Sequence, residues 1–170
     1  VLIITILIGT LSSCSLISDD TILYWNIGGV PDSIDPALCT TLYGGNVINH
    51  TFEGLIREKN GIIYPGIAES YDISEDGLTI TFHLRKSKWS DGSVLTADDF
   101  VYSWLRAMDP ETKSESSYIW EQTNIVYAKE YANGMASKQD VGIKAIDDYT
   151  LKVSLNSPTD HFISLMSFYT

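Results

Sequence analysis

The sequence predicts a mixed α/β fold in which antiparallel strands are covered by amphipathic helices. Residues 78–84 and the paired segments 141–145 and 151–155 alternate apolar and polar side chains, which is the period of a half-buried strand. Residues 96–108 instead space their apolar side chains for one face of a helix. A chain of 170 residues that is 44% hydrophobic and rich in aromatic residues is long and apolar enough for one substantial core.

The chain opens with an uncharged apolar run, residues 1–11, followed by Ser12, Ser13 and Cys14. Leucine, two small residues and cysteine form the pattern of a bacterial lipobox, in which the cysteine thiol receives the lipid. The run is shorter than the roughly 20 residues that span a bilayer, but it suits a signal-peptide core. We therefore expect residues 1–13 to be a signal peptide and residues 14–21 to be a lipidated cysteine with a polar tether. The alternative is a buried helix or strand with a chance cysteine.

This lipobox predicts a protein outside the cytoplasm, anchored to the cell membrane through Cys14 on the surface or periplasmic side. The sequence begins at Val1 without an initiator methionine or the basic residues that precede a signal-peptide core. We therefore expect the start of the natural chain to be missing.

Residues 22–27 are aromatic and β-branched and predict a strand, which Gly28-Gly29 and Pro31-Asp32 end. A turn is expected at Ser33–Pro36. A short helix is expected over residues 45–55, because four apolar residues fall at helical spacing there: Val47, Ile48, Phe52 and Leu55.

The middle of the chain carries strong turn and cap signals. Asp76-Gly77 predicts a hairpin between residues 70–73 and 78–84, and residues 89–92 predict another turn. Thr96 and Asp99 stand three residues apart at the start of the next helix, as in a capping box. Asp109-Pro110 ends that helix, since the residue before proline leaves the α region.

The last third predicts a loop over residues 111–124 and a weaker helix over residues 125–133, ending at Asn133-Gly134. A hairpin follows, with its turn at Asp147-Asp148. Thr159 or Asp160 is expected to cap a final helix through Phe162, Leu165 and Met166. Because nothing terminates that helix, we expect the natural chain to continue past residue 170.

Catalytic and metal-binding patterns do not occur in the sequence. It has no phosphate-binding glycine loop, and its three histidines, His50, His83 and His161, lack ligand spacing. With Cys14 lipidated, Cys39 has no cysteine to pair with. A formal net charge of -11 argues against a nucleic-acid partner. The sequence therefore predicts no catalytic residue, no cofactor and no metal.

Several blocks of sequence together resemble one known family. They are Pro65–Tyr71 (Pro-Gly-Ile-Ala-Glu-Ser-Tyr), Ser74–Arg85, Lys88–Gly92 (Lys-Trp-Ser-Asp-Gly), Leu95–Trp104, Met108–Pro110 and Val141–Leu151, with Ser33–Pro36 and Phe52–Leu55 upstream. In this order they resemble the extracellular solute-binding proteins of family 5, the binding components of peptide ABC importers, from about residue 22 to the end. The blocks at Trp89–Gly92 and Phe100–Trp104 look most like the oligopeptide branch, and less like the dipeptide, nickel or haem branches.

The resemblance implies a type II periplasmic-binding-protein fold with three lobes. Residues 22–52 would begin large lobe I, and residues 53–170 would form most of the small, β-rich lobe II. The rest of lobe I and all of lobe III would be absent. The structural blocks named above would define this scaffold and would not touch ligand.

The resemblance also implies a site and partners. The main chain of Thr40, Thr41 and Leu42 would pair with a bound oligopeptide, and the side chain of Tyr118 would line the pocket. Better-known relatives carry an acidic residue at the position of Thr40. The alternatives are a structural loop at residues 40–42 and a surface aromatic at Tyr118.

The implied protein is a monomeric, non-enzymatic lipoprotein that delivers oligopeptides to an ABC permease driven by partner ATPases. A second hypothesis is a lipoprotein that presents a peptide pheromone or regulates uptake. A third, a peptidase or amidase, has no nucleophile–base pattern in the sequence to support it.

Overall fold

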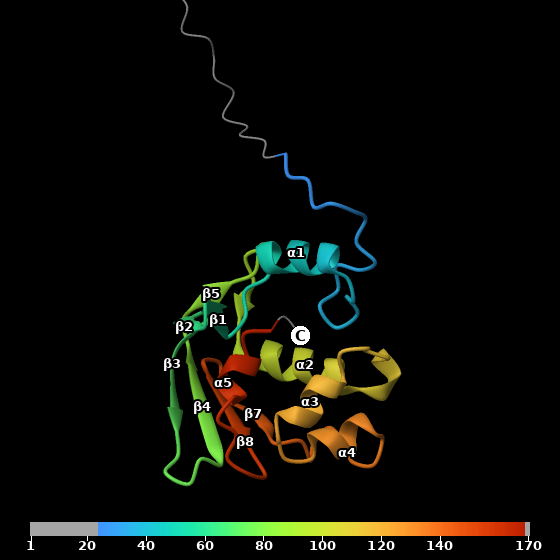
Figure 1. The fold of residues 1–170 in the computed structure, drawn as a ribbon. Coiled ribbons are helices and arrows are strands. Elements are labelled where there is room, and N and C mark those ends of the chain that lie inside the picture. The colour runs from blue at the N-terminus through green and yellow to red at the C-terminus, as the bar shows by residue number, and fades with distance from the viewer. Residues whose placement is uncertain (1–23, 169–170) are drawn as a thin grey trace, which may run out of the picture.

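The computed structural model describes residues 24–168 (Figure 1). The signal peptide predicted at residues 1–13, the tether at residues 14–21 and the lipid-attachment residue Cys14 lie outside the described residues. Within the described chain, a sheet and its covering helices form the lower body in Figure 1, and helix α1 lies above them.

The core is built on a four-stranded antiparallel sheet with the order β3-β4-β8-β7. Its strands are β3 (Ala68–Ile73), β4 (Thr79–Leu84), β7 (Ile143–Asp147) and β8 (Thr150–Ser154). The two predicted hairpins are confirmed, and they join through β4 and β8, where Phe82 lies opposite Leu151. Both of these side chains are fully buried. Alternation along β4 therefore predicted the buried face correctly.

The turns that close these hairpins follow from local sequence. Gly77 has φ +68°, a left-handed conformation that glycine adopts without steric cost. The Asp76 carboxylate accepts hydrogen bonds from Ser74 Oγ at 2.5 Å and Leu78 N at 3.0 Å. The predicted turn at residues 89–92 is also confirmed, between β5 (Ser87–Lys88) and β6 (Val94–Leu95).

A further hairpin, β1 (Ile56–Lys59) with β2 (Ile62–Pro65), was not predicted. Its turn residues Asn60 and Gly61 both have positive φ, 55° and 76°. Asn-Gly is a strong signal for such two-residue hairpin turns, so the local sequence did carry the information.

Helix α2 (Ala97–Met108) packs against β7 and β8 and covers the sheet (Figure 1). The Asp99 carboxylate accepts a hydrogen bond from the Thr96 backbone N–H at 2.7 Å, which confirms the predicted start. Trp104, Ala107 and Met108 are buried on its inner face. α2 is thus firmly attached to the core, and it carries Arg106 toward the N-terminal segment.

The predicted loop at residues 111–124 is wrong, because it contains the 3-10 helix η1 (Pro110–Thr112) and helix α3 (Tyr118–Gln122). α3 has no side-chain cap, but it buries Trp120, whose ring lies 5.3 Å from that of Trp104. Burial of Trp120 in the core therefore stabilises α3, because a helix of only five residues is not stable through its local sequence alone.

Two shorter helices complete the body, α4 (Ala128–Ala132) and α5 (Phe162–Leu165). α4 ends before Asn133-Gly134 as predicted, but it starts three residues later than expected. The predicted cap of α5 is wrong, because His161 precedes the helix and the Thr159 hydroxyl instead donates to the carbonyl of Ser157.

The N-terminal segment differs most from expectation. Residues 24–27 do not form the predicted strand, because no neighbouring strand pairs with them in the described chain, and Tyr24 is 89% exposed. α1 (Leu42–Thr51) begins three residues earlier than predicted, since Thr41 caps it, and it ends because Phe52 is extended. This segment depends on polar contacts for its position.

Candidate functional site

The loop from Asp32 to Leu42 leads into α1, and its first half is a compact turn built around Asp35. The backbone carbonyl of Asp35 accepts hydrogen bonds from Leu38 N and Cys39 N, each at 3.0 Å. Its side chain accepts another from Ala37 N at 3.0 Å, while Ser33 Oγ accepts from the Asp35 N–H. The aspartate before Pro36 therefore organises the turn through both its main chain and its side chain.

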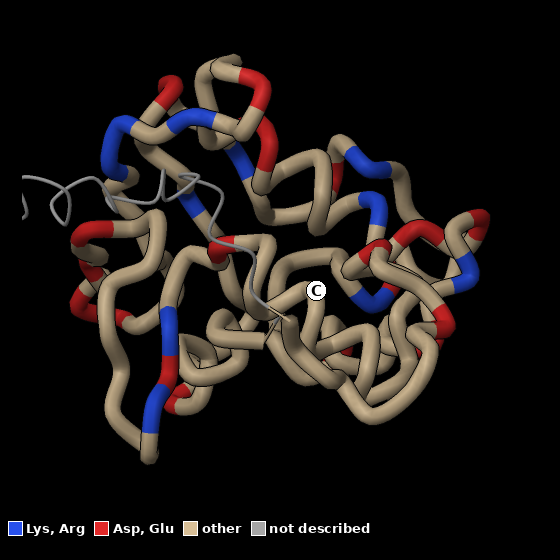
Figure 2. The backbone as a smooth tube through the Cα atoms, turned by 90° about the horizontal axis from the view of Figure 1, so that it is seen from above, with Lys and Arg blue, Asp and Glu red and all other residues tan. Residues whose placement is uncertain are grey.

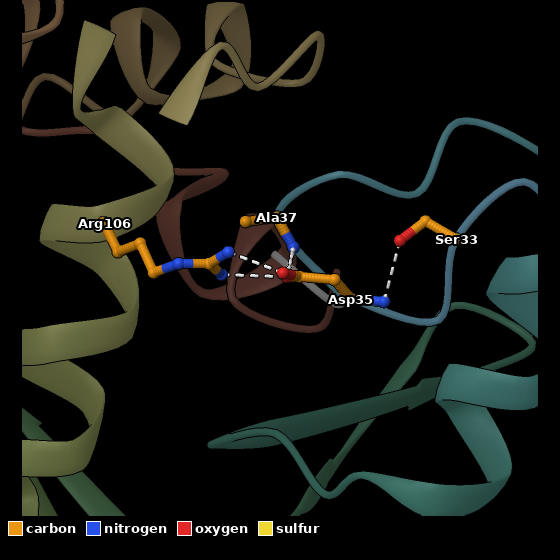
Figure 3. A network of polar contacts seen from close by, with 4 residues as sticks. All are labelled: Ser33, Asp35, Ala37 and Arg106. Carbon is orange, nitrogen blue, oxygen red and sulfur yellow. Dashed lines mark hydrogen bonds and ion pairs between the residues drawn. The ribbon is translucent and has the colours of Figure 1, made fainter. Parts of the chain in front are cut away.

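Asp35 also ties this turn to the core through Arg106 of α2 (Figure 3). Arg106 Nη1 donates to Asp35 Oδ1 at 2.8 Å and Nη2 donates to Oδ2 at 2.5 Å. The hydrogen bonds from Arg106 hold the pKa of Asp35 below its ordinary value, and those to Asp35 raise the pKa of Arg106. This two-pronged ion pair joins residues 71 positions apart and fixes the loop relative to α2.

The second half of the loop is arranged around the Asp32 carboxylate. Asp32 Oδ2 accepts hydrogen bonds from Thr40 Oγ1 at 2.6 Å and from Thr40 N at 2.8 Å. Asp32 Oδ1 accepts one from Thr41 Oγ1 at 2.6 Å and a longer one from Cys39 Sγ at 3.8 Å. The side chains of Thr40 and Thr41 thereby hold the pKa of Asp32 well below its ordinary value. The carboxylate stays ionised, and three O–H and N–H donors share its two oxygens, while the Cys39 thiol lies nearer the Thr41 carbonyl, at 3.4 Å.

These contacts decide which main-chain groups of the predicted peptide-binding segment are available. The Thr40 N–H donates to Asp32, and the Thr41 carbonyl accepts the Gly45 N–H of α1. Among residues 24–168, the Thr40 carbonyl and the Thr41 N–H, which belong to the same peptide group, have no hydrogen-bond partner. Thr40 is exposed and Leu42 is 77% exposed. The Thr40–Thr41 peptide group is therefore unpaired within residues 24–168, while the peptide groups before and after it are each held by a hydrogen bond.

Thr40, Thr41 and Leu42 are consecutive in the loop, and within residues 24–168 no hydrogen bond or ring contact joins Tyr118 to any of them. Tyr118 is the first residue of α3, which packs beside α4 below α1 in Figure 1, and its side chain is 59% exposed. The peptide-binding roles of these four residues remain predictions. Asp32 and Arg106 were missed, since no local pattern connects either one to residues 40–42.

A cleft of about 1300 Å³ lies beneath α1. Its walls come from α1, from residues 52–59, from α2 and from residues 165–168. Its lining includes Arg106 but not Thr40, Thr41, Leu42 or Tyr118. The predicted peptide-binding segment therefore does not line the cleft, although Pro36 and Ala37 earlier in the same loop do.

Within the part of the chain that the structure describes, neither the distribution of charge nor the grouping of metal-binding side chains marks a further site. Acidic and basic residues are interspersed around the molecule in Figure 2. Within residues 24–168, no three His, Cys, Asp or Glu side chains are grouped so that they could hold a metal ion. No helix in that same part of the chain is long and apolar enough to cross a membrane.

Comparison with solved structures shows that the fold is that of the type II periplasmic binding proteins. The solved structure of Haemophilus influenzae OppA in complex with the peptide RPPGFSPFR has this fold, with a TM-score of 0.80 over 84% of this chain and 35% identity. The pheromone receptor PrgZ matches with a TM-score of 0.76 over 83% of this chain and 34% identity.

Sequence comparison identifies the family. A sequence model of the bacterial extracellular solute-binding proteins, family 5 Middle, matches residues 63–170. The chain belongs to this family. It is 43% identical over 153 residues to the oligopeptide-binding protein OppA of Bacillus subtilis, covering 88% of this chain and 28% of that relative. The chain thus spans little more than a quarter of the length of its relatives. The predicted family and fold class are confirmed.

Proposed function

We propose that this chain is part of an oligopeptide-binding protein that captures peptides outside the membrane for an ABC importer. The observation that carries the proposal is the match, over 84% of the chain, to a structure with a bound nonapeptide. Peptide main chains all offer the same N–H and C=O groups, so a loop that presents main-chain groups suits ligands of varied sequence. Residues 22–52 would begin large lobe I, and residues 53–170 would form most of small lobe II.

The further parts of the proposal concern location and partners. Lipidation of Cys14 would keep a monomeric binding protein beside its permease and raise its effective concentration there. Transport energy would come from partner ATPases. Replacement of Cys14 by alanine should release the protein from the membrane fraction, and an unchanged distribution would contradict the lipid anchor.

Peptide binding is tested on the protein at its full natural length by isothermal titration calorimetry. A random pentapeptide mixture and single defined peptides are the ligands. Binding of many unrelated peptides supports nutrient import, whereas no binding of any peptide overturns the proposal. Residues 15–170 alone should bind weakly or not at all, and micromolar binding by this piece would overturn the lobe assignment.

A second candidate is a signalling lipoprotein, which the match to the pheromone receptor PrgZ favours. The same titrations distinguish the two, because a signalling receptor should select one defined peptide over the random mixture.

A further inference from the structure

Asp32 differs from Asp76, Asp91 and Asp140, which also accept hydrogen bonds from both hydroxyl and backbone donors. Asp76, Asp91 and Asp140 each take these donors from residues two or three positions away, so they stabilise isolated turns. Asp32 takes its donors from residues seven to nine positions away. It therefore closes a whole loop onto itself.

The closed loop has little room to relax. Cys39 is 3% exposed, and its thiol lies beside the Asp32 carboxylate. A Cβ added at Gly44 would lie 2.4 Å from the Ser33 carbonyl oxygen, 2.5 Å from Cys39 Sγ and 3.2 Å from Asp32 Oδ1. The first turn of α1 therefore packs directly against both ends of the loop.

We infer that Asp32 is a positioning residue for peptide binding, which fixes the Thr40–Thr41 peptide group so that its carbonyl and N–H face a ligand's main chain. This inference rests on the function proposed above. Asp32 holds the Thr40 N–H on one side of that peptide group, and Gly45 N holds the Thr41 carbonyl on the other. With its neighbours fixed on both sides, the free group loses little conformational entropy when a ligand pairs with it.

The test compares the peptide affinity of variants of the full-length protein by calorimetry. Asp32→Ala should lower the affinity for a peptide that the unaltered protein binds by about tenfold, the scale of one charge-assisted hydrogen bond. Asp76→Ala is the matched control, because it removes the same charge and a similar set of bonds from the β3–β4 turn. It should leave affinity within about twofold, the scatter of distant surface changes.

Two further variants separate positioning from charge. Asp32→Glu keeps the charge but displaces the carboxylate by one methylene, so positioning predicts a loss close to that of Asp32→Ala. Full affinity in Asp32→Glu would overturn the inference. The double variant Thr40→Val, Thr41→Val removes the two hydroxyl groups that donate to the Asp32 carboxylate. Asp32→Ala should therefore lower peptide affinity less in this double variant than in the unaltered protein.

Thermal unfolding shows whether each variant is folded at the titration temperature, and the threonine variants provide the test if Asp32→Ala is not. Unchanged affinity in folded Asp32→Ala, or a loss equal to that in Asp76→Ala, would refute the positioning role. Failure of the unaltered protein to bind any peptide would instead refute the proposed function.

Discussion

The ion pair between Arg106 and Asp35 gives the sharpest test of how the N-terminal loop is held to the core. Arg106→Met removes both N–H donors and leaves the methylene stem largely in place. Charge-assisted hydrogen bonds contribute about 1.5–3 kcal/mol when sheltered, and exposed ion pairs contribute about 0–1 kcal/mol. The side chains of Arg106 and Asp35 are 35% and 33% exposed, so the pair lies between these limits. We expect a loss of about 1–2 kcal/mol in the free energy of unfolding.

The assay is urea unfolding followed by tryptophan fluorescence, since Trp104 and Trp120 are buried against each other in the core. A double-mutant cycle with Asp35→Asn isolates the pair, because asparagine keeps an oxygen that can accept the Ala37 N–H. The coupling energy should be about 1–2 kcal/mol and should fall in 1 M NaCl, where charges are screened within about 3 Å.

Arg57 provides the matched control. It forms an ion pair with Glu53 four residues earlier, but its side chain is 65% exposed. Arg57→Met should therefore change the free energy of unfolding by less than about 0.5 kcal/mol. A coupling energy near zero for Arg106 and Asp35, or equal losses in Arg106→Met and Arg57→Met, would refute the reasoning that this pair anchors the loop.

Three other predictions follow from the structure. The pKa of Asp35 is lowered in the folded state, so the stability that its charge contributes is present above about pH 4 and is lost as pH falls through the folded pKa. The difference in unfolding free energy between the unaltered protein and Asp35→Asn, measured by urea titration, should therefore shrink between pH 6 and pH 3. A difference that stays constant over this range would contradict the prediction. Phe82→Ala should cost about 3–5 kcal/mol in the free energy of unfolding, because this fully buried side chain lies at the centre of the sheet; a loss below about 1 kcal/mol would show that the core collapses around the cavity. Gly44→Ala should destabilise the protein although alanine favours helices by about 1 kcal/mol, because its Cβ would clash with the Ser33 carbonyl and Cys39 Sγ; an increased melting temperature would refute this packing.

The sheet could be predicted from the sequence because its signals are local. Alternation along β4 and β8, the Asp76-Gly77 turn and the Thr96–Asp99 cap each lie within a few residues of the structure they specify. The β1–β2 hairpin carried an equally local Asn60-Gly61 signal, so it was predictable in principle.

Other elements depend on partners that are distant in sequence. α3 forms where Trp120 is buried against Trp104, and no pattern within five residues specifies that contact. The run at residues 22–27 has strong strand preference, but its described residues have no neighbouring strand to pair with. Propensity alone therefore overestimated this strand and missed that helix.

The candidate site shows the same division. A resemblance of sequence blocks suggested residues 40–42, of which Thr40 and Leu42 are exposed, and their peptide-binding role stays a prediction. The residues that hold them could not be predicted, because Arg106 lies 71 positions from Asp35 and Asp32 appeared only as part of a turn-forming pair with Pro31.

The loop needs two aspartates because it has almost no hydrophobic anchor of its own. Between residues 24 and 42 only Ala37 and Cys39 are buried, so apolar burial contributes little to holding it. Arg106 of α2 binds Asp35 and so holds the turn against the core. Asp32 in turn binds Thr40 and Thr41 and so holds the second half of the loop against the first. Under the proposed function, these contacts let the protein hold an exposed peptide group rigidly for pairing with a ligand's main chain. Loss of Asp35 should then weaken peptide binding as well as stability, whereas loss of Asp32 should affect mainly binding.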